Sequence, residues 1–540
     1  HTEKYGIRYV NAHNEEAAVH VAEGYARIAR KPGVVLGNPG CGTGNMLAGL
    51  VSAHAEGHPV VAIGTLRPRI KSDPNRGGAW QAADTESMAR PITKYAATLR
   101  QKERLPEMLR AAFRAALTGR PGPSYLGIPD ELLLETLDAD RLPSIYEASR
   151  YRVTSMGAGD PDAIARAAEL LVGAERVYVH AGKGVLWADG TQELLALGEH
   201  LGACLGSSLG ARGAIPEDHP HCFHPFDLGG AGLARAEADV VLVVGGRLGE
   251  YDGWGTPPMW GDPVRQTTLQ IDADPMSIGL NRPVDLGIVA DAKAALAALL
   301  DQVRERSAPR SAPRDLARYR EKSAETMKQG MSYLGEETRG GVHPGKLVLA
   351  VRQHFPREVI TVLDGGNTTL TGVAFHPILS SPSFLYSVKM GYLGTGVPFA
   401  LGAKLAAAGR PVCCITGDGA LGFHLMELET AVREELPVVV VAAVDDAWGM
   451  EKTAFLGQGY GAEAWAHRGI DLAHVAYDEI ARGLGCHAER VERDEELEGA
   501  LGRAVASGRP ALLHVAIDRE LNTRPPGWEQ FRAARSTAGT

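Results

Sequence analysis

Short, mainly apolar runs alternate along this chain with longer stretches in which apolar residues recur at helical spacing. The clearest case begins with the run Val412–Thr416, which predicts a buried strand. An amphipathic helix is expected after Gly419, and Val438–Val444 is a second, wholly apolar run of the kind found inside parallel sheets. The stretch therefore predicts a strand–helix–strand unit. The apolar positions of its helix are Phe423, Met426, Leu428, Ala431 and Val432.

The same alternation continues through the rest of the chain. In the first third, the expected strands are 7–12, 34–38 and 60–64, and the expected helices are 15–29, 46–55 and 105–117. In the middle third, the expected strands are 177–180, 240–245 and 268–271. Strands that alternate with helices are typical of parallel α/β sheets. We therefore predict an α/β fold of three doubly wound parallel-sheet domains, at residues 1–130, 155–305 and 341–540.

Irregular or charged segments connect these units. Residues 131–156 are predicted to form a linker, and residues 307–329 a connector followed by an exposed helix. The tail 522–540 is expected to act as a lid over a site. Because the chain begins at His1 rather than at methionine, its natural N-terminus is expected to lie upstream.

Composition narrows the classes of function. The chain has 540 residues, of which 44% are hydrophobic and 22% charged, and this is ordinary for a soluble globular protein. Its formal net charge of −9 argues against nucleic acid and anionic membranes as partners. No apolar run approaches the roughly 20 residues of a membrane span. Six cysteines in so long a chain are no disulfide framework, and a reducing cytoplasm is the simple interpretation.

Two carboxylates stand where the first predicted unit would present them together. Asp418 follows the strand Val412–Thr416, and Asp445 follows the strand Val438–Val444. The carboxyl ends of parallel strands meet at one edge of the sheet, where ligands bind in such folds. Beside a glycine turn with free N–H groups, two carboxylates suit a hard divalent cation that carries phosphate. The alternative is an ordinary turn with an N-capping aspartate and a solvated pair of carboxylates.

This stretch resembles the thiamin diphosphate motif, which is a Gly-Asp-Gly turn, a helix and strand, and an Asn-rich end. The pattern Trp448–Glu451 is similar to the acetolactate synthase, pyruvate oxidase and benzaldehyde lyase family. The resemblance implies that Asp418, Asp445 and the backbone carbonyl of Ala447 bind Mg2+. The family usually has asparagine at position 445, and often serine at position 420. The contacts to thiamin diphosphate that it implies, besides Glu15, are Asn367, Thr368, Leu393, Gly417, Asp418, Gly419, Ala420, Leu421 and Asp445.

Glu15 begins the first predicted helix of the chain. By itself, this position indicates charge complementarity with a helix N-terminus. The segment Glu15–Ala26, however, resembles the pyrimidine-binding helix of the same family. The resemblance implies that Glu15 is catalytic: it hydrogen-bonds the aminopyrimidine of the cofactor and passes a proton to it, which favours the imino form. Glu16 is the neighbouring alternative and is expected to face a different side of the helix.

Two further residues take their expected roles from the resemblance. Leu393, in the segment Gly391–Pro398, matches the apolar wedge beneath the bent cofactor, and its alternative is a core leucine. Gln81 matches a glutamine that points at the substrate, and its alternative is a side chain of a surface loop. The loop before it is basic, which indicates either a solvated face or a site for a carboxylate or phosphate group. Its cations are Arg67, Arg69, Lys71 and Arg76.

The middle third carries weaker signals. The segment Gly182–Gly184 has a lone glycine pair, a weak dinucleotide motif; some relatives bind FAD in this domain, but FAD is the less favoured expectation here. The histidines and cysteine of residues 219–224 fit no zinc-binding spacing, so we expect an incidental cluster. Acetolactate synthases have a second arginine near the position of Tyr251, and its absence argues against that activity.

The resemblance covers nearly the whole chain and implies an enzyme that requires thiamin diphosphate and Mg2+. We expect a C–C bond lyase or carboligase that acts on 2-ketoacids or 2-hydroxy ketones through an enamine. The tandem histidines of pyruvate decarboxylase-like enzymes have no counterpart between Val60 and Trp80, and this difference argues against simple decarboxylation. The alternatives are an acetolactate synthase, a 2-hydroxyacyl-CoA lyase, a simple 2-ketoacid decarboxylase, a flavin dehydrogenase and a non-catalytic subunit. The resemblance also implies a homodimer or homotetramer in which Glu15 and Asp418 reach one cofactor from different subunits, and a βα unit before residue 1.

Overall fold

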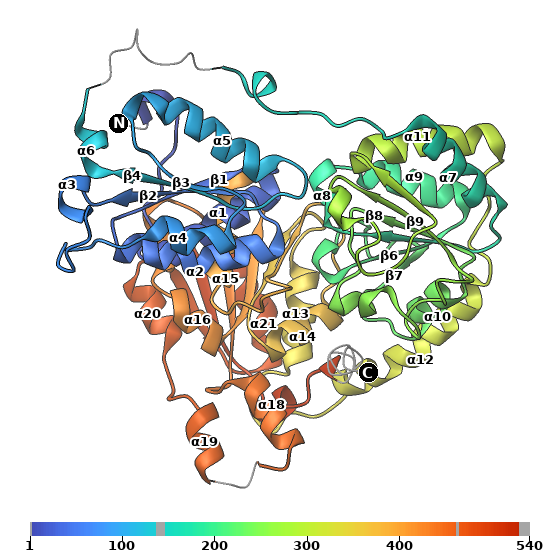
Figure 1. Cartoon of the computed structure of the whole chain (residues 1–540). Coiled ribbons are helices and arrows are strands. Elements are labelled where there is room, and N and C mark those ends of the chain that lie inside the picture. Colours follow the sequence, from blue (N-terminus) through green and yellow to red (C-terminus); the bar gives the residue numbers. More distant parts are fainter. Residues whose placement is uncertain (1–2, 137–145, 461–463, 529–540) are drawn as a thin grey trace.

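A computed structural model of the protein describes residues 3–136, 146–460 and 464–528. Its helices surround three β-sheets of four, six and six strands (Figure 1). Every pairing between the named strands is parallel. The predicted α/β fold with three parallel sheets is therefore confirmed. No helix in these parts of the chain combines the length and the apolar character that a membrane span requires.

The first sheet has the strand order β1-β2-β4-β3. Its strands are β1 (Gly33–Gly37), β2 (Val60–Leu66), β3 (Ala96–Thr98) and β4 (Ser124–Pro129). Its helices are α1 (Glu15–Ala29), α2 (Cys41–Glu56), α3 (Arg69–Ser72), α4 (Thr85–Ala89), α5 (Leu105–Leu117) and α6 (Asp130–Leu134). α1 precedes β1 and α2 follows it, so the start of each helix lies close to the turn after β1.

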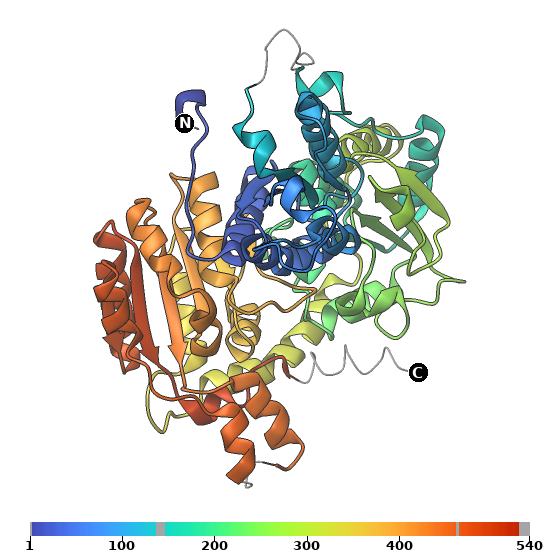
Figure 2. The same ribbon diagram turned by 60° about the vertical axis from the view of Figure 1, so that its left-hand side comes forward.

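The prediction of a strand at residues 7–12 is wrong, because this segment forms no strand in the structure. It runs instead beside the end of α17 (Glu427–Arg433), where Arg8 donates a hydrogen bond to the backbone oxygen of Glu434 (Figure 2). Ile7 is 59% exposed, so its side chain contributes little to the core. A strand requires a neighbour that satisfies its backbone groups, and an apolar run does not reveal whether that neighbour exists.

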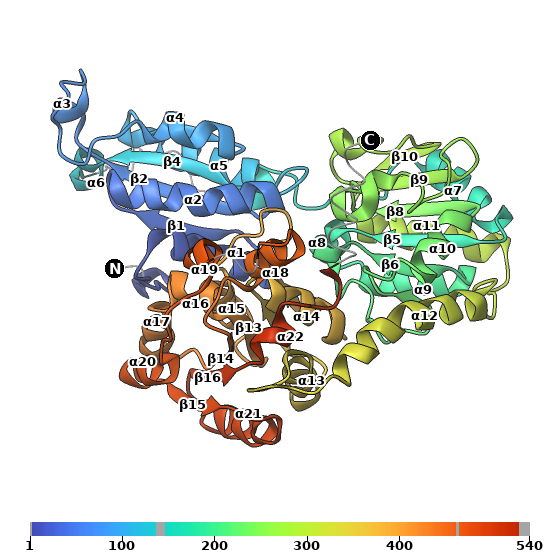
Figure 3. The same ribbon diagram turned by 90° about the horizontal axis from the view of Figure 1, so that it is seen from below.

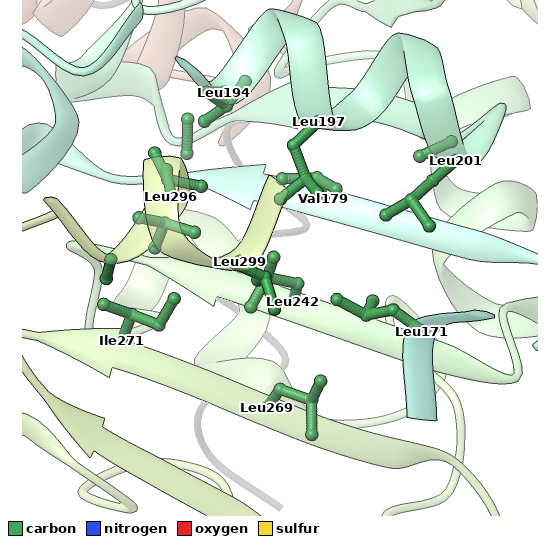
Figure 4. Packing of buried hydrophobic residues seen from close by; sticks show 14 of the residues in the cluster. Leu171, Val179, Leu194, Leu197, Leu201, Leu242, Leu269, Ile271, Leu296 and Leu299 are labelled. Carbon is green, nitrogen blue, oxygen red and sulfur yellow. The ribbon is translucent and has the colours of Figure 1, made fainter. Parts of the chain in front are cut away.

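The second sheet has the order β10-β9-β8-β5-β6-β7. Its strands are β5 (Val177–Ala181), β6 (Cys204–Ser207), β7 (Cys222–Phe223), β8 (Val240–Val244), β9 (Thr267–Asp272) and β10 (Leu286–Val289). Its helices are α7 (Pro161–Gly173), α8 (Lys183–Ala188), α9 (Thr191–Leu201), α10 (Gly230–Glu237) and α11 (Ala292–Arg306). Leu171, Leu197 and Leu299 of α7, α9 and α11 form one fully buried cluster with Leu242 of β8 and Val179 of β5, and Leu197 lies against Val179 (Figure 4). The strand order reverses beside β5, and ligands bind outside such points in α/β sheets.

The third sheet has the order β12-β11-β13-β14-β16-β15. Its strands are β11 (Ile360–Leu363), β12 (Phe384–Leu385), β13 (Val412–Gly417), β14 (Val439–Val444), β15 (His487–Val491) and β16 (Ala511–Ala516). Helices that precede or follow these strands are α13 (Pro344–His354), α14 (Asn367–Phe375), α15 (Gly396–Ala406), α16 (Asp418–His424), α17, α18 (Gly449–Gly457), α19 (Ala464–Ile470), α20 (Tyr477–Gly483), α21 (Leu497–Ala506) and α22 (Arg519–Asn522).

The helix predicted after Gly419 is two short helices, α16 and α17, rather than one. Phe423 and Met426 are 55% and 47% exposed, so they do not belong to a buried helical face. Leu428 and Ala431, in contrast, are fully buried. Nδ1 of His424, the last residue of α16, is hydrogen-bonded to the backbone oxygen of Gly394, which ties the break to a loop that is distant in sequence. Such a contact is not visible in the apolar pattern.

The connecting segments agree in part with their predictions. α12 (Leu316–Leu334) is the exposed helix expected in the second part of 307–329, and it extends beyond that segment. α6 lies at the start of the predicted linker 131–156, of which residues 137–145 fall outside the described parts. The predicted lid is described only as far as residue 528, so its closure over the site stays a prediction.

The first and third sheets are joined through α1 and α15, which lie between them (Figure 3). The two helices approach closely because glycines stand at their contact. A Cβ atom at Gly24 would lie 2.5 Å from the backbone oxygen of Phe399, and one at Gly402 would lie 2.1 Å from that of Val21. Arg27 of α1 also donates hydrogen bonds to the backbone oxygens of Phe384 and Tyr386. This packing fixes how the two sheets face one another.

We expect Gly402→Ala to destabilise the protein by about 1–3 kcal/mol, because the added methyl group would force two packed helix backbones apart. Gly409→Ala is the control, since a Cβ atom there meets nothing within 4 Å. Thermal unfolding followed by circular dichroism would measure both changes. Equal melting temperatures for the two variants would contradict the close contact of α1 and α15.

Candidate active site

Asp418 and Asp445 directly follow neighbouring strands of the third sheet, as their positions in the sequence predicted. β13 and β14 pair in parallel, with Gly417 opposite Ala443, so both strands end at the same edge of the sheet. Asp418 follows β13 directly, and Asp445 follows β14 directly. Their residues are 3% and 4% exposed. Two carboxylates are therefore held close to one another and away from bulk water.

The electrostatics of this pair favour a bound cation. Burial, and after it the charge of Asp445, raises the pKa of Asp418 to about 7. Burial also raises the pKa of Asp445, although a hydrogen bond from Asn522 acts in the opposite direction. Like charges in a poorly hydrated site destabilise one another, and a divalent cation between them would remove that penalty.

The third oxygen predicted for the metal is the backbone carbonyl of Ala447. Ala447 forms an isolated bridge with Asp471, in which Trp448 donates to Ile470 and Leu472 donates to Asp446. No described residue donates a hydrogen bond to the oxygen of Ala447 itself. No cluster of three acidic, histidine or cysteine side chains that could hold a metal occurs among the described residues. Two carboxylates with one carbonyl oxygen are a hard-oxygen donor set, which fits Mg2+ when phosphate and water complete the shell.

Asn522 of α22 is a residue of this site that the sequence analysis did not identify in that role. Its Nδ2 donates a 2.8 Å hydrogen bond to Oδ2 of Asp445. Asn522 is 3% exposed, and its Oδ1 has no partner among the described residues. No motif marks it, because it lies far along the chain from Asp445 and is joined to it only by folding.

Asn367 begins α14, at the end of β11, and lies in the same network. Its Nδ2 donates to the backbone oxygens of Gly449, at 2.8 Å, and Asn522, at 2.7 Å. This side chain therefore links α14, α18 and α22. Its amide donors are already used, so the groups that remain for an anion are the backbone N–H groups in the first turn of α14.

The loops after β11 and β13 face one another across the predicted diphosphate position. A Cβ atom at Gly417 would lie 3.2 Å from Oγ1 of Thr368, and one at Gly365 would lie 3.2 Å from the backbone nitrogen of Gly417. Ala420 and Leu421 are buried in α16 just beyond. The predicted contacts at 367–368 and 417–421 thus come together, around the two aspartates, at one sheet edge.

Glu15 lies at the start of α1, against the glycine-rich turn that opens α2. Its Oε2 accepts a 3.0 Å hydrogen bond from Nδ2 of Asn45. A Cβ atom at Gly42 would lie 2.6 Å from its Oε1, so only glycine leaves room for the carboxylate. Glu16 points elsewhere, toward the imidazoles of His20 and His424, at 4.0 and 3.9 Å. The expected difference in direction between the two glutamates is confirmed.

Gln81 lies beside the same turn. Its Nε2 donates to Sγ of Cys41 at 3.6 Å, and a Cβ atom at Gly40 would lie 2.7 Å from its backbone oxygen. Its φ angle of 56° is in the left-handed region, which is uncommon for a residue other than glycine. Glu15 and Gln81 are thus gathered around residues 40–45.

The basic loop before Gln81 is largely paired within the chain. Arg67 lies 3.4 Å from a carboxylate oxygen of Asp130, and Arg69 lies 2.8 Å from one of Glu131. Arg67 also lies over the ring of Trp80, 5.4 Å from its centroid. This pairing supports the solvated face rather than the anion site as the role of the loop.

A cavity of about 1670 Å3 lies at the edge of the third sheet, beside the two aspartates. Asp418, Asp445 and Leu393 line it, together with loops of the central sheet. Neither Glu15 nor Gln81 of the same chain lines it. The sequence-predicted residues are therefore divided between two places within one chain.

The glycine pair of the central domain has a role in packing. A Cβ atom at Gly182 would lie 2.2 Å from the backbone oxygen of Gly245, and one at Gly184 would lie 2.6 Å from the Cα of Gly245. The loops after β5 and β8 cross at this contact. The glycines are explained by this crossing, which needs no bound dinucleotide.

Comparison with known proteins matches all three parts of the chain. Residues 1–88 match the thiamine pyrophosphate enzyme N-terminal TPP binding domain, residues 164–299 its central domain, and residues 364–515 its C-terminal TPP binding domain. Thiamine pyrophosphate is another name for thiamin diphosphate.

Similar curated proteins extend over most of the chain. A "Probable acetolactate synthase large subunit" of Methanococcus aeolicus is 30% identical over 95% of this chain and 86% of its own. The sulfoacetaldehyde acetyltransferase of Alcaligenes xylosoxydans xylosoxydans is 28% identical, over 96% and 88%. The acetolactate synthase isozyme 3 large subunit of Escherichia coli K12 is 29% identical, over 96% and 90%.

Proposed function

This chain belongs to the thiamine pyrophosphate enzyme family, and on that premise we propose that it binds thiamin diphosphate with Mg2+ to break or form carbon–carbon bonds beside a carbonyl group. The substrates are 2-ketoacids or 2-hydroxy ketones. Relatives named as acetolactate synthases and as a sulfoacetaldehyde acetyltransferase support this class of chemistry. The cofactor, when bound, supplies the electron sink that such bond cleavage requires.

The observation that carries the proposal is the buried pair Asp418 and Asp445 beside the first turn of α14. The pair suits a divalent cation, and the N–H groups of Asn367 and Thr368 suit the diphosphate that the cation would bridge. Asp445, in place of the usual asparagine, adds a negative charge. Its hydrogen bond from Asn522 directs one oxygen to an amide, so the other is left for the metal.

We expect Asn522→Ala to weaken metal binding by about tenfold to a hundredfold, because partners that orient a metal ligand contribute on this scale. A titration with Mn2+ in the presence of thiamin diphosphate, followed by electron paramagnetic resonance, would measure the affinity. Thr523→Ala is the matched control, since its hydroxyl only donates to the backbone oxygen of Glu520. Unchanged Mn2+ affinity in Asn522→Ala would exclude this role.

Within the active site, Glu15 is the residue assigned to proton transfer at the pyrimidine ring of the cofactor. Its carboxylate is oriented by Asn45 and confined by Gly42, so its position is set before a ligand arrives. Leu393 lines the cavity beside the metal-binding edge and would support the cofactor from below. Gln81 lies on the same turn as Glu15 and would face the substrate.

We further propose that the complete site forms between two copies of the chain, with Glu15 from one and Asp418 from the other. The division of these residues between two places within a single chain supports this arrangement. A homodimer is then the smallest active unit. Each dimer would contain two equivalent sites.

Mixing of two inactive variants tests the shared site. We expect Glu15→Gln and Asp418→Ala protein, unfolded and refolded together, to regain part of the wild-type turnover, because one site of each mixed dimer would combine two intact residues. Each variant refolded alone is the control. Absence of any recovery in dimers shown to be mixed would place both residues in the site of a single subunit.

The reaction class is tested by turnover of the apoprotein with thiamin diphosphate and Mg2+ added or withheld. Pyruvate, benzoylformate and benzoin are the substrates to compare. Turnover that depends on both additions is expected, and the preferred substrate separates lyase from carboligase activity. Turnover that is independent of both would contradict the proposed function.

A further inference from the structure

Four cationic residues from all three parts of the chain gather at one wall of the cavity that holds Asp418. Arg120 follows α5, Lys183 begins α8, Arg247 follows β8, and Lys389 lies shortly before Leu393. Lys389 is an exposed residue, yet partial loss of hydration, and after it the charges of Lys183, Arg247 and Arg120, lowers its pKa to about 7. The four side chains are thus close enough to repel one another.

Two of these cations are already satisfied by the protein. Nζ of Lys183 forms a 2.6 Å ion pair with Oε2 of Glu56 and also donates to the backbone oxygen of Glu56. Arg120 donates to the backbone oxygens of His54 and Ala55, at the end of α2. Lys183 and Arg120 therefore hold the C-terminal end of α2 against the neighbouring loops.

The other two cations have no such partner. Among the described residues, neither Nζ of Lys389 nor the guanidinium of Arg247 forms a hydrogen bond or an ion pair within 4.0 Å. The backbone N–H of Lys389 donates to Oε1 of Glu56, which fixes the main chain and leaves the ammonium group in the cavity. Nδ2 of Asn281 donates to the backbone oxygen of Arg247 and does not contact the guanidinium group.

The nearby acids form no ion pair with Lys389 or Arg247. Glu56 is 3% exposed and is committed to Lys183 and to the backbone of Lys389. Asp272 and Asp274 lie beyond, near Arg247 and Arg120. Burial raises the pKa of Asp272 to about 6, so this carboxyl is still mostly charged at neutral pH. None of these three acids lies within 4.0 Å of the charged group of Lys389 or Arg247, so both cations stay available to an added anion.

We propose that Lys389 and Arg247 bind an oxyanion, namely a phosphate, phosphonate, sulfonate or second carboxylate group, at the substrate end of this cavity. Guanidinium and ammonium groups are the side chains that bind such anions by charge-assisted hydrogen bonds. The proposal rests on the proposed function and names its substrate class: a ketoacid or an acceptor with a further anionic group, or a free oxyanion that acts as acceptor.

The volume of the cavity, and the loop that Lys389 shares with Leu393, support this assignment. Its volume of about 1670 Å3 exceeds the roughly 300–1,000 Å3 of an ordinary ligand pocket, so space remains beside a cofactor. Lys389 and Leu393 line the cavity from the same loop, and Leu393 is the residue assigned to support the cofactor. An oxyanion at Lys389 would thus hold a substrate near the reacting centre.

Isothermal titration of the full-length protein, saturated with Mg2+ and thiamin diphosphate, tests the site with inorganic phosphate and methanesulfonate as probes. We expect Lys389→Met to weaken binding of either probe by about tenfold to a hundredfold, the scale of a charge-assisted hydrogen bond. Lys389→Arg keeps the charge and is expected to retain most of the affinity. Lys328→Met, at an exposed lysine of α12, is the matched control.

The outcomes separate this proposal from the proposed function. Equal probe affinity in wild type and Lys389→Met would overturn the oxyanion site, while cofactor binding, measured separately, would leave the proposed function intact. Binding that is present in the apoprotein and lost once the cofactor is added would also overturn it, since the cations would then serve the diphosphate. If Lys389→Met does weaken probe binding, turnover shows the source of the anion. Consumption of phosphate during turnover would identify a free oxyanion acceptor, whereas competition between phosphate and the keto substrate would show that the site binds an anionic group of the substrate.

Discussion

Glu15→Gln is expected to lower the turnover number by about a hundredfold to ten-thousandfold, the range for loss of a positioned acid–base group. Glutamine can keep the 3.0 Å contact with Asn45 and the fit against Gly42, but it cannot exchange a proton with the cofactor. Steady-state kinetics with saturating thiamin diphosphate and Mg2+ would measure the loss. Hydrogen–deuterium exchange at C2 of the bound cofactor should slow in parallel.

Glu16→Gln is the matched control for this prediction. Glu16 belongs to the same first turn of α1, but its carboxylate faces His20 and His424. We expect a turnover number within a few-fold of wild type. A large loss in Glu16→Gln together with a small one in Glu15→Gln would reverse the assignment of the two residues.

Asp418→Asn is expected to weaken binding of Mg2+ and thiamin diphosphate by at least about a hundredfold, since partners of metal ligands alone contribute tenfold to a hundredfold. Asparagine is nearly the same size, so the turn at Gly417 should remain intact. Burial and the charge of Asp445 already disfavour a charged Asp418 without metal. The metal-free variant should therefore be at least as stable as the metal-free wild type.

Two measurements together test this expectation. Quenching of tryptophan fluorescence by added cofactor would report affinity, and thermal unfolding without metal would report stability. Asp446→Asn is the neighbouring control, because its carboxylate contacts His474 and Arg519 and does not line the cavity, so we expect only a small change through its charge. Undiminished cofactor affinity in Asp418→Asn would remove this residue from the metal site.

The cations near the predicted substrate position differ from those expected of an acetolactate synthase. The second arginine expected near Tyr251 is absent, whereas Lys389 adds a cation from the third part of the chain. Specificity in such enzymes depends on contacts to the parts of the substrate that do not react. The pair Lys389 and Arg247 would therefore select substrates without changing the chemistry at the cofactor.

Local patterns were sufficient where an element's own residues determine its structure. The runs at 412–416 and 438–444 became β13 and β14, and the strand ends placed Asp418 and Asp445 together as predicted. These features depend on periodicity and on short-range backbone geometry, which are written in consecutive residues. The roles of Glu15 and of the loop after β11, in contrast, were implied only by the resemblance to the family.

Features that depend on distant neighbours could only be found in the tertiary structure. The segment 7–12 has a strand-like pattern but no partner strand, and the helix after Gly419 breaks where His424 meets Gly394. The cations at one cavity wall also come from all three domains. Asn522 reaches Asp445 only because α22 folds back onto α14 and α18.

The sequence by itself therefore determined the class of fold, the family and the meeting of Asp418 and Asp445 at one sheet edge. The tertiary structure decided which polar groups surround that edge, the division of Glu15 from Asp418 within one chain, and the free charges at Lys389 and Arg247. The physical reason is that a strand or a turn is set by neighbours in sequence. A binding site is set by the packing of segments whose approach no local pattern encodes.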